Sequence, residues 1–405
     1  MERWNKLIRL SLLIAILVLS ISTFARTLKC DFIVDSLCYE ILSEEENTVG
    51  VSYDFYGNFI PELKYKRPTG ELIIPDTVVF NGARYTVTEI SKEGFQDLFL
   101  ITSVKLPNTL KRINDGGLCQ AFSSEELYLP PSVEYLGFAA IVNGNLKTVN
   151  LENVKYFGSH ALMKTSVTEA YIRRNVQYDA GVFFKCNELE KVIIEDGVTS
   201  LPSYIFGNCP NLRKVELPTS LTDIGDHALD GCTIDSITIP KGVKILRHGL
   251  LAENHNLKDV IMSEGIDTIE YWVFLNCYSL EKIHFPASVR YIHERAVYFF
   301  KEPENPSSQI KDIYCEGTVP PKEGCYVEGV TLHVPKGCKE IYAQTDNWAR
   351  YGDNIVDDIE LEGIHNSKFV IHNSDAPAYD LQGRRVAHPK QGEIYIQDGK
   401  KYINK

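Results

Sequence analysis

A motif recurs every 21 to 23 residues across residues 101–300, and this repeat constrains the fold more than any other feature of the chain. Residues 212–232, LRKVELPTSLTDIGDHALDGC, are a clear copy. Further copies span residues 189–209, 234–252, 257–277 and 280–300, and fainter ones begin near Ile101, Ser124, Leu146 and Val167. Periodicity of this kind predicts a solenoid, in which each unit buries its apolar face against its neighbours. A solenoid offers a long surface and seldom a deep catalytic pocket, which favours a binding role.

Each repeat divides into a short strand and the turns that follow it. Val215 and Leu217 alternate with polar residues, so both are expected to point inward from a strand. Pro218 comes next and lacks the N–H group that a strand ladder needs, so the strand ends there. Ser220 begins a change of direction, as small residues do at the same place in other copies. We therefore predict a β-rich repeat solenoid with one short parallel strand per repeat of 21–23 residues.

The residues around the repeats are predicted to form β-rich caps, because an end coil otherwise exposes its core and a strand edge. Residues 32–43 alternate as a strand would, with Asp35-Ser36 in between, and Asn81-Gly82 is a strong signal for a two-residue hairpin. Trp348 and Tyr351 are expected to cover the last coil. Asp398-Gly399 predicts a second hairpin in a small β unit at the carboxyl terminus.

These patterns predict five segments along the chain. They are a signal peptide at residues 1–25, a β cap with the first coil at 26–100, the repeats at 101–300, the carboxy-terminal cap of the solenoid at 301–363, and a linker with a small β unit at 364–405.

The first residues have the pattern of an export signal. Arg3, Lys6 and Arg9 precede an apolar run at residues 10–21, which is too short to span a bilayer comfortably. Residues 23–25 supply a cleavage site, so we expect a mature amino terminus near Arg26 and no transmembrane segment in the mature chain. A lipid anchor at Cys30 and an uncleaved anchor are the alternatives.

The net charge of the chain indicates which classes of partner it is expected to bind. Asp and Glu number 54 against 42 Lys and Arg, which gives a net charge of −12. An acidic chain is a poor partner for nucleic acid and for anionic membranes, so neither is expected.

Half of the ten cysteines fall at related places in the repeats. Cys209, Cys232 and Cys277 share one slot, Cys186 lies one residue earlier, and Cys119 is a looser match. A small, weakly polar side chain suits a crowded inner corner, so free buried thiols are predicted there. The cysteines of the two caps are better placed for disulfides, whose pairing the sequence leaves open: Cys30, Cys38, Cys315, Cys325 and Cys338.

Catalytic sites and metal sites often have recognisable sequence motifs. His160, His227 and His248 recur at one place in their repeats, which we interpret as a solvated turn. The sequence contains no H-E-x-x-H motif, tight Cys/His cluster or G-x-S-x-G elbow. We therefore predict no metal, no cofactor and no enzyme activity.

The informative surface is the exposed strand position between the two inward apolar residues of each repeat. Down the stack this position holds Lys105, Tyr128, Asn150, Tyr171, Ile193, Glu216, Thr238, Ile261 and His284. Exposed apolar groups on a repeat ladder can mark a partner surface, although Tyr and Ile also suit strands through β-propensity alone. The predicted ligand-binding residues are Tyr128, Tyr171, Ile193, Ile261 and His284.

The repeat resembles the BspA-like leucine-rich repeats of exported bacterial proteins. The resemblance rests on residues 212–232 and their neighbours, on the lead-in at residues 72–90, and on the exit at residues 319–348. It implies a right-handed leucine-rich-repeat coil, export, and adhesion or recognition at cell surfaces. Glu152-Asn153 and Arg173-Arg174 depart from the pattern in the third and fourth copies, so these coils are expected to be locally irregular.

Residues 379–401 are similar to the end of a type IX secretion sorting domain, and a plain terminal β unit is the alternative. Together these features predict an exported, non-enzymatic recognition or adhesion protein that binds extracellular or host proteins through its strand ladder. A carbohydrate-binding surface protein is the main alternative, and an enzyme is a third. Glycans are therefore kept among the expected partners.

Overall fold

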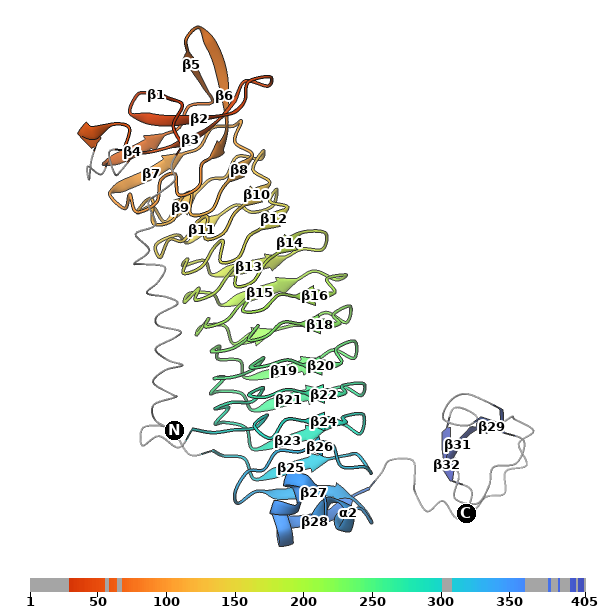
Figure 1. Ribbon diagram of the computed structural model, residues 1–405. Coiled ribbons are helices and arrows are strands. Elements are labelled where there is room, and N and C mark those ends of the chain that lie inside the picture. Colours follow the sequence, from red (N-terminus) through yellow and green to blue (C-terminus); the bar gives the residue numbers. More distant parts are fainter. Residues whose placement is uncertain are drawn as a thin grey trace. The chain divides into compact units, whose positions relative to one another are not determined.

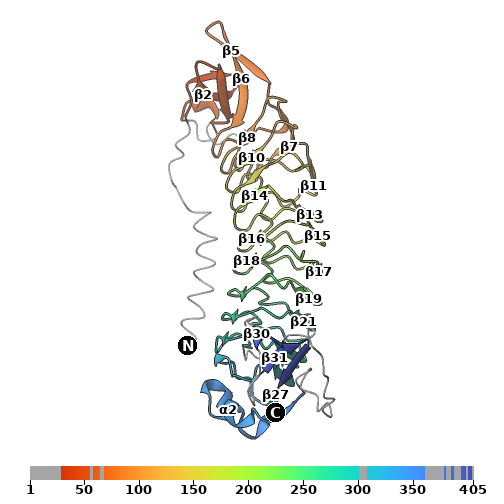
Figure 2. The same ribbon diagram turned by 90° about the vertical axis from the view of Figure 1, so that its right-hand side faces the viewer.

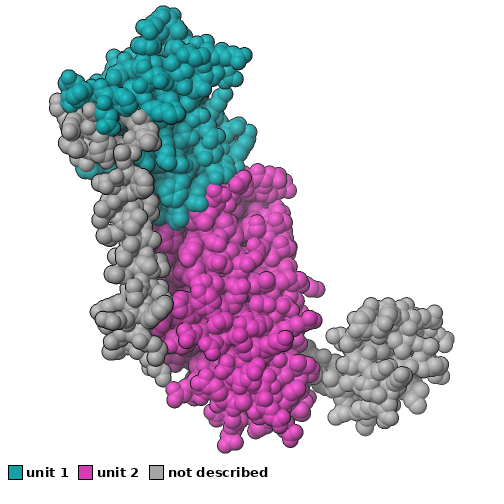
Figure 3. All heavy atoms as spheres, viewed as in Figure 1, with its two compact units in different colours: residues 1–165 teal, residues 166–405 magenta. Residues whose placement is uncertain are grey.

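A computed structural model describes residues 29–54, 58–63, 68–300 and 308–360, together with the backbone of four short strands between residues 378 and 403. The predicted signal peptide at residues 1–25 lies outside the described residues. Two compact units divide the chain, Met1–Thr165 and Ser166–Lys405 (Figure 3). In the part of the chain that is described, no helix is long and apolar enough to cross a bilayer.

Unit 1 begins with antiparallel strands and continues as parallel ladders (Figure 1). Its elements are β1 (Phe32–Val34), β2 (Leu37–Ser43), β3 (Thr48–Ser52), η1 (Pro61–Leu63), β4 (Gly70–Ile73), β5 (Thr77–Phe80), β6 (Ala83–Ile90), β7 (Ile101–Lys105), β8 (Arg112–Ile113), β9 (Glu126–Leu127), β10 (Tyr135–Leu136), β11 (Thr148–Val149) and β12 (Tyr156–Phe157).

Two antiparallel pairs lie at the amino-terminal end of unit 1, of which the second was expected as a hairpin. β1 pairs with β2 across Asp35 and Ser36, whose φ angles of 48° and 65° close a tight turn. β5 pairs with β6 across Asn81-Gly82, as the hairpin signal predicted. The strand β6 then pairs in parallel with β8, which passes the sheet from the cap into the repeats.

In the third copy, the side chain of Asn150 binds the backbone of the coil before it, and the irregularity expected at Glu152-Asn153 stays a prediction. Its side-chain Oδ1 accepts a 2.7 Å hydrogen bond from the backbone N–H of Leu129, and its Nδ2 donates a 2.8 Å bond to the carbonyl of the same residue. The side chain thus takes the place of a ladder bond between β9 and β11, which pair over only two residues each.

Unit 2 contains the regular part of the solenoid. Its elements are β13 (Glu169–Ile172), β14 (Gln177–Tyr178), β15 (Lys191–Ile194), β16 (Ser200–Leu201), β17 (Lys214–Val215), β18 (Asp223–Ile224), β19 (Ser236–Ile239), β20 (Ile245–Leu246), β21 (Asp259–Met262), β22 (Thr268–Ile269), β23 (Lys282–Phe285), β24 (Tyr291–Ile292), β25 (Asp312–Cys315), β26 (Lys322–Glu323), β27 (Thr331–Pro335), α2 (Lys339–Ala343), η2 (Asp346–Asn354), β28 (Ile355–Ile359), β29 (Ala378–Tyr379), β30 (Arg385–Val386), β31 (Ile394–Gln397) and β32 (Lys400–Ile403).

Two parallel ladders run along different sides of these coils (Figure 2). One contains the sheets β13–β15–β17, β19–β21 and β23–β25–β27–β28, and we call its outward surface the strand face. The other contains β16–β18 and β20–β22–β24–β26. The chain is therefore a β-rich leucine-rich-repeat solenoid, as the period of the sequence predicted.

The cysteine slot forms a column of buried thiols inside unit 2. Cys209, Cys232 and Cys277 are buried, and each thiol donates to a backbone carbonyl 26 residues earlier in the chain, at 3.2 to 3.3 Å. Burial raises the pKa of the Cys232 thiol to about 12. These free, buried thiols confirm the prediction made from the repeat.

One prediction about cysteine was wrong. Cys119 is only half-buried, because the backbone places Ala121, two residues later, in the inner corner. The five cap cysteines, for which the sequence left disulfides open, are free as well. Cys315 and Cys325 serve the cap as small apolar side chains, since both are buried in its core.

The carboxy-terminal cap of unit 2 closes the last coil with aromatic side chains. Trp348 is fully buried and donates from Nε1 to the carbonyl of Pro321 at 2.7 Å, and the Tyr342 hydroxyl donates to Gly317 at the same distance. Gly324 leaves room for the Trp348 ring, which would lie 2.3 Å from a Cβ atom at that position. Trp348 and Tyr351 therefore cover the core as predicted.

A separate four-stranded sheet, in the order β30–β29–β31–β32, ends the chain. Gln397 of β31 lies opposite Lys400 of β32 in antiparallel register. The two residues that join them, where a hairpin turn was predicted, lie outside the described residues.

Candidate functional site

The strand face of unit 2 has a row of exposed residues because exposed and buried residues alternate along its strands. In β13, β15, β19 and β23 the first and third residues are exposed and the second and fourth are buried. Because successive side chains of a strand point to opposite faces, the third residues of stacked strands form one outward row. This row contains Tyr171, Ile193, Glu216, Thr238, Ile261, His284, Tyr314 and His333.

Four of the five predicted ligand-binding residues lie in this row. Tyr171 and Ile193 are opposite one another in the β13–β15 ladder, with 50% and 39% of their surfaces exposed. Ile261 is 61% exposed and lies opposite Thr238. Tyr171 and Ile193 are direct neighbours and form one apolar patch, and a contiguous exposed patch of this kind can mark a contact surface.

The fifth predicted residue, Tyr128, belongs to unit 1. It directly follows β9 and is 66% exposed, so it has the outward orientation that the repeat predicted. Within unit 1 its polar neighbour is Asn150, whose side chain is bound to the backbone of Leu129.

A stack of three rings continues the row at its carboxy-terminal end. Tyr314 lies between His284 and His333, with ring centroids 4.2 Å and 4.3 Å apart and interplanar angles of 2° and 13°. The sequence pointed to His284 alone, because the repeat pattern fades after residue 300 and hides the register of β25 and β27. In the structure, His284 pairs with Tyr314 and Tyr314 pairs with His333, which gives the register of these strands.

Carboxylates hold the last ring of this stack. The Nδ1 atom of His333 lies 2.9 Å from Asp358, and its Nε2 atom lies 3.1 Å from Asp312. Burial alone lowers the pKa of His333, but the hydrogen bonds to the two aspartates outweigh it, and the pKa is raised. Two carboxylates therefore hold the ring at this end of the row.

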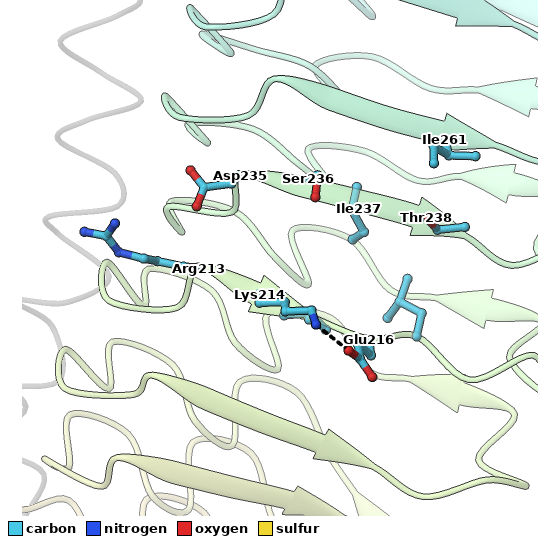
Figure 4. Close-up of a pocket in the computed structure, with 10 residues that line it drawn as sticks. Arg213, Lys214, Glu216, Asp235, Ser236, Ile237, Thr238 and Ile261 are labelled. Carbon is cyan, nitrogen blue, oxygen red and sulfur yellow. Dashed lines mark ion pairs between the residues drawn. The ribbon is translucent and has the colours of Figure 1, made fainter.

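A shallow depression of about 550 Å³ opens on the strand face between β17, β19 and Ile261. Figure 4 shows Arg213 and Asp235 at one end of this depression and Ile261 at the other. Lys214 and Glu216 form an ion pair of 2.6 Å along its side. The whole lining comprises Arg213, Lys214, Val215, Glu216, Leu217, Asp235, Ser236, Ile237, Thr238 and Ile261.

The turn that carries His227 and His248 differs from the prediction of a solvated turn. Tyr204, His227, His248 and Tyr271 form a column of half-buried rings, with successive centroids 4.8, 4.4 and 3.7 Å apart. Burial lowers the pKa of His248 to about 4 and also lowers the pKa of His160. His160 and His227 share one backbone position, with φ angles of 61° and 54°, but Gly249 holds that position in the next coil, so His248 lies one residue earlier than the sequence interpretation placed it. The contact between rings of neighbouring coils is what the sequence alone did not reveal.

Clusters of metal-ligating side chains bear on whether the protein could hold a metal ion. Among the residues with described positions, no group of three or more His, Cys, Asp or Glu side chains could hold a metal ion.

The fold and the strand face together define the class of protein. It is a stack of coils that displays an outward row of apolar and aromatic residues. The chain matches the BspA type leucine-rich repeat region in six copies, over residues 82–180 and 177–302. The match covers more than half of the 405 residues, and the chain belongs to this family.

Several solved structures are similar to the chain. A leucine-rich repeat protein from Bacteroides ovatus ATCC 8483 is 19% identical, with a TM-score of 0.43, over 82% of this chain and 98% of the other. The pneumococcal vaccine antigen PcpA is 13% identical, with a TM-score of 0.40, over 81% and 97%. A leucine-rich cell surface protein from Faecalibacterium prausnitzii A2-165 is 15% identical, with a TM-score of 0.36, over 78% and 97%. A search of curated proteins found no match.

Proposed function

We propose that this chain is an exported, non-enzymatic recognition protein that binds a protein partner through the strand face of unit 2. The observation that carries the proposal is the outward row with Tyr171, Ile193 and Ile261, each at least 39% exposed. Apolar and aromatic side chains of this kind contribute most when a partner removes them from water. Leucine-rich repeats of this family supply the rigid ladder on which such a row is displayed.

The charge around the row supports a protein partner. Glu169 pairs with Lys191 at 3.2 Å, and Lys214 pairs with Glu216, so both signs alternate along the face. Such a mixed rim around apolar groups is typical of protein interfaces. The chain as a whole is acidic, which disfavours polyanions as partners.

Export is proposed from residues 1–25, and surface delivery from residues 364–405. Amino-terminal sequencing of the protein recovered from cells should give Arg26 or a residue close to it. A chain that keeps Met1 and stays in the cytoplasm would contradict export. A version that ends near Gly363 should lose surface display if the last sheet is a sorting unit, and unchanged display would make that sheet a plain terminal unit.

The partner class is tested with the mature chain on arrays of extracellular-matrix proteins and of glycans. Saturable binding to a protein is expected. The variant Tyr171→Ser/Ile193→Ser should lose that binding, while Lys241→Ser, an exposed turn residue away from the strand face, should keep it. Saturable glycan binding without any protein hit would replace the proposal by the carbohydrate-binding alternative.

A further inference from the structure

The ring of His333 lies between carboxylates from two different strands. Its Nδ1 atom is 2.9 Å from Oδ1 and 3.0 Å from Oδ2 of Asp358 in β28, and its Nε2 atom is 3.1 Å from Oδ1 of Asp312 in β25. His333 itself belongs to β27, which lies between β25 and β28 in the sheet. One side chain therefore connects three neighbouring strands, of which β28 is the edge strand.

The charge state of the ring follows from this geometry. An ionised carboxylate only accepts hydrogen bonds, so each ring nitrogen needs a proton in order to bind one. A neutral imidazole carries one N–H group, whereas the imidazolium carries two. Only the charged form of His333 can therefore bind Asp312 and Asp358 at the same time.

The other surroundings of the ring favour the charged form on balance. Tyr314 stacks on His333 with ring centroids 4.3 Å apart and an interplanar angle of 13°, and an aromatic face attracts a cation. The side chain of His333 is 13% exposed, so the carboxylates supply the counter-charge that water supplies elsewhere. Burial lowers the pKa of His333, and the hydrogen bonds to Asp358 and Asp312 raise it by more, so the folded ring has a pKa above 6.5.

A bulge in β28 brings Asp358 to the ring. Between two of its ladder pairs with β27, the strand β28 has one residue more than β27 has. The extra length falls at Asp357 and Asp358, and a bulge of this kind re-aims a side chain. Asp358 contacts His333, whereas Asp357 accepts a 3.3 Å hydrogen bond from the backbone N–H of Gly337. Two adjacent carboxylates of β28 thus have different partners.

The neighbouring charges leave the ring to its two aspartates. Other titratable groups of the adjoining strands form pairs of their own, namely His284 with Glu316 and Lys336 with Glu360. Tyr314 stands between His333 and the first of these pairs. The charge on His333 is therefore balanced by Asp312 from β25 and Asp358 from β28.

We propose that His333 is a pH-dependent clamp that joins the edge strand β28 to β25 across β27. When the ring gives up a proton to the solvent, one nitrogen becomes an acceptor and repels the carboxylate in front of it. Either tautomer breaks the connection, because the clamp needs both contacts. The clamp does not depend on which partner the strand face binds.

The direction of the pH dependence follows from the raised pKa of His333. The folded chain binds the proton more tightly than the unfolded chain, so the stabilisation is complete below pH 6.5. It is lost as the pH rises through the higher pKa of the folded ring. The last coil is therefore held more tightly in acidic than in alkaline surroundings.

The test measures amide hydrogen exchange of β28 in the full chain by mass spectrometry, near pH 6 and near pH 8.5. Rates are corrected for the exchange of free peptides at each pH, and the β13–β15 ladder of the same protein is the internal reference. His248, whose pKa is lowered to about 4, keeps its charge state over this range.

Three variants assign the response. In Asp358→Asn the side-chain amide can donate to an unprotonated ring nitrogen, so both contacts persist when the ring is neutral. Asp357→Asn is the matched control, since it removes the same charge from the adjacent residue of the bulge, which binds Gly337 and not the ring. His333→Gln removes the titrating group.

Protection of β28 in the unaltered chain should fall about tenfold relative to the reference between the lower and the higher pH, the change that one pKa unit corresponds to. Asp357→Asn should show the same fall, and Asp358→Asn and His333→Gln should show little or none. Equal protection at both pH values in the unaltered chain would overturn the proposal.

The variants can overturn the proposal as well. A fall that persists in His333→Gln would assign the pH response to another group. A fall in Asp358→Asn as large as that in Asp357→Asn would show that the contact with the ring does not hold β28. If His333→Gln does not fold, the two aspartate variants decide the question, because each differs from the unaltered chain by one charge on an exposed strand.

Discussion

The side-chain amide of Asn254 donates a 2.8 Å hydrogen bond to the carbonyl oxygen of Leu229 in the preceding coil. In the coil before, the Cys232 thiol donates to Phe206, and in the coil after, the Cys277 thiol donates to Leu251. Asn254 therefore occupies the cysteine slot of its repeat. It also accepts a 3.2 Å bond from the backbone N–H of Ile234, a bond that a thiol donor does not supply in the other coils.

Replacement of Asn254 by Ala should destabilise the protein by about 1–3 kcal/mol, because Leu229 and Ile234 lose their buried partners. Asn254→Cys keeps one donor and should cost less. Urea unfolding midpoints of the two variants and of Cys232→Ala, for which a small cavity should cost on the order of 1 kcal/mol, provide the comparison. Equal midpoints for Asn254→Ala and Asn254→Cys would show that the hydrogen bonds contribute nothing.

The buried thiols should resist alkylation in the native protein. Burial raises the pKa values of Cys209, Cys232 and Cys277, so little reactive thiolate forms and the reagent has no access. Cys338 is half-buried, as Cys30 and Cys119 are, and should react before the three buried thiols. Mass spectrometry after a timed exposure to N-ethylmaleimide measures the order, and all four should react once the chain unfolds. A disulfide between Cys209 and Cys232 would contradict the structure.

His248 should make the protein sensitive to acid. Its pKa is lowered from 6.5 to about 4, chiefly by burial and then by the nearby His227, with Asp226 opposing and His293 adding to the shift. The unfolded chain then binds the proton more tightly than the folded one, so stability is present above pH 6.5 and falls as the pH drops toward 4.

The variant His248→Phe keeps a ring in the column and should lose part of this acid sensitivity. Thermal unfolding between pH 4 and pH 7 should show a smaller fall in midpoint for the variant than for the unaltered protein. His255→Gln, at a histidine whose side chain is 55% exposed, provides the control and should retain the full fall. An identical pH profile for His248→Phe would mean that the acid response arises elsewhere.

Gly249 should be intolerant of a side chain because of His227. A Cβ atom at Gly249 would lie 2.3 Å from Cε1 and Nδ1 of the His227 ring. The left-handed φ of 62° at Gly249 also strains any side chain there, although Tyr204 and His227 adopt φ angles of 58° and 54° at the same place in earlier coils. Gly249→Ala should therefore cost about 1–3 kcal/mol through overpacking.

A double-mutant cycle isolates this contact. In a His227→Ala background, Gly249→Ala should cost much less, which gives a positive coupling between two residues in contact. Strict additivity of the two changes would place the strain in the backbone of Gly249 and not in its contact with the ring.

Most of the fold could be predicted from the repeat. The position of a residue within the repeat explains which predictions were confirmed and which residues were missed. Pro218 and the alternation around Val215 placed the strand, because strand ends and inward residues follow from local chemistry. Asn254 was missed although it lies 22 residues after Cys232 and 23 before Cys277, since the polar residue concealed the slot. Alignment by spacing instead of residue type would have found it.

Other features depended on contacts between coils, which a single repeat does not encode. The ring column of Tyr204, His227, His248 and Tyr271 arises only when neighbouring turns stack. The depression beside Ile261 is lined by residues from three successive coils, so it too arises only when coils stack.

The last prediction concerns the exposed residues of the strand face. Tyr171, Ile193 and Ile261 are 50%, 39% and 61% exposed, so their replacement by Ser should cost less stability than the loss of a fully buried side chain. A partner that covers them should bind more weakly by at least ~2 kcal/mol, because desolvated aromatic and apolar anchors contribute on that scale. Surface plasmon resonance with the protein partner found on the arrays measures the loss.

Two further variants show which surface the partner uses. Tyr128→Ser tests unit 1 separately, since Tyr128 is 66% exposed on its own ladder. Arg290→Ser alters a side chain that is 86% exposed away from the strand face and should leave affinity unchanged. If Arg290→Ser weakens binding while the strand-face changes do not, the partner contacts another side of the coils, because an outward row that a partner leaves in water cannot contribute to its affinity.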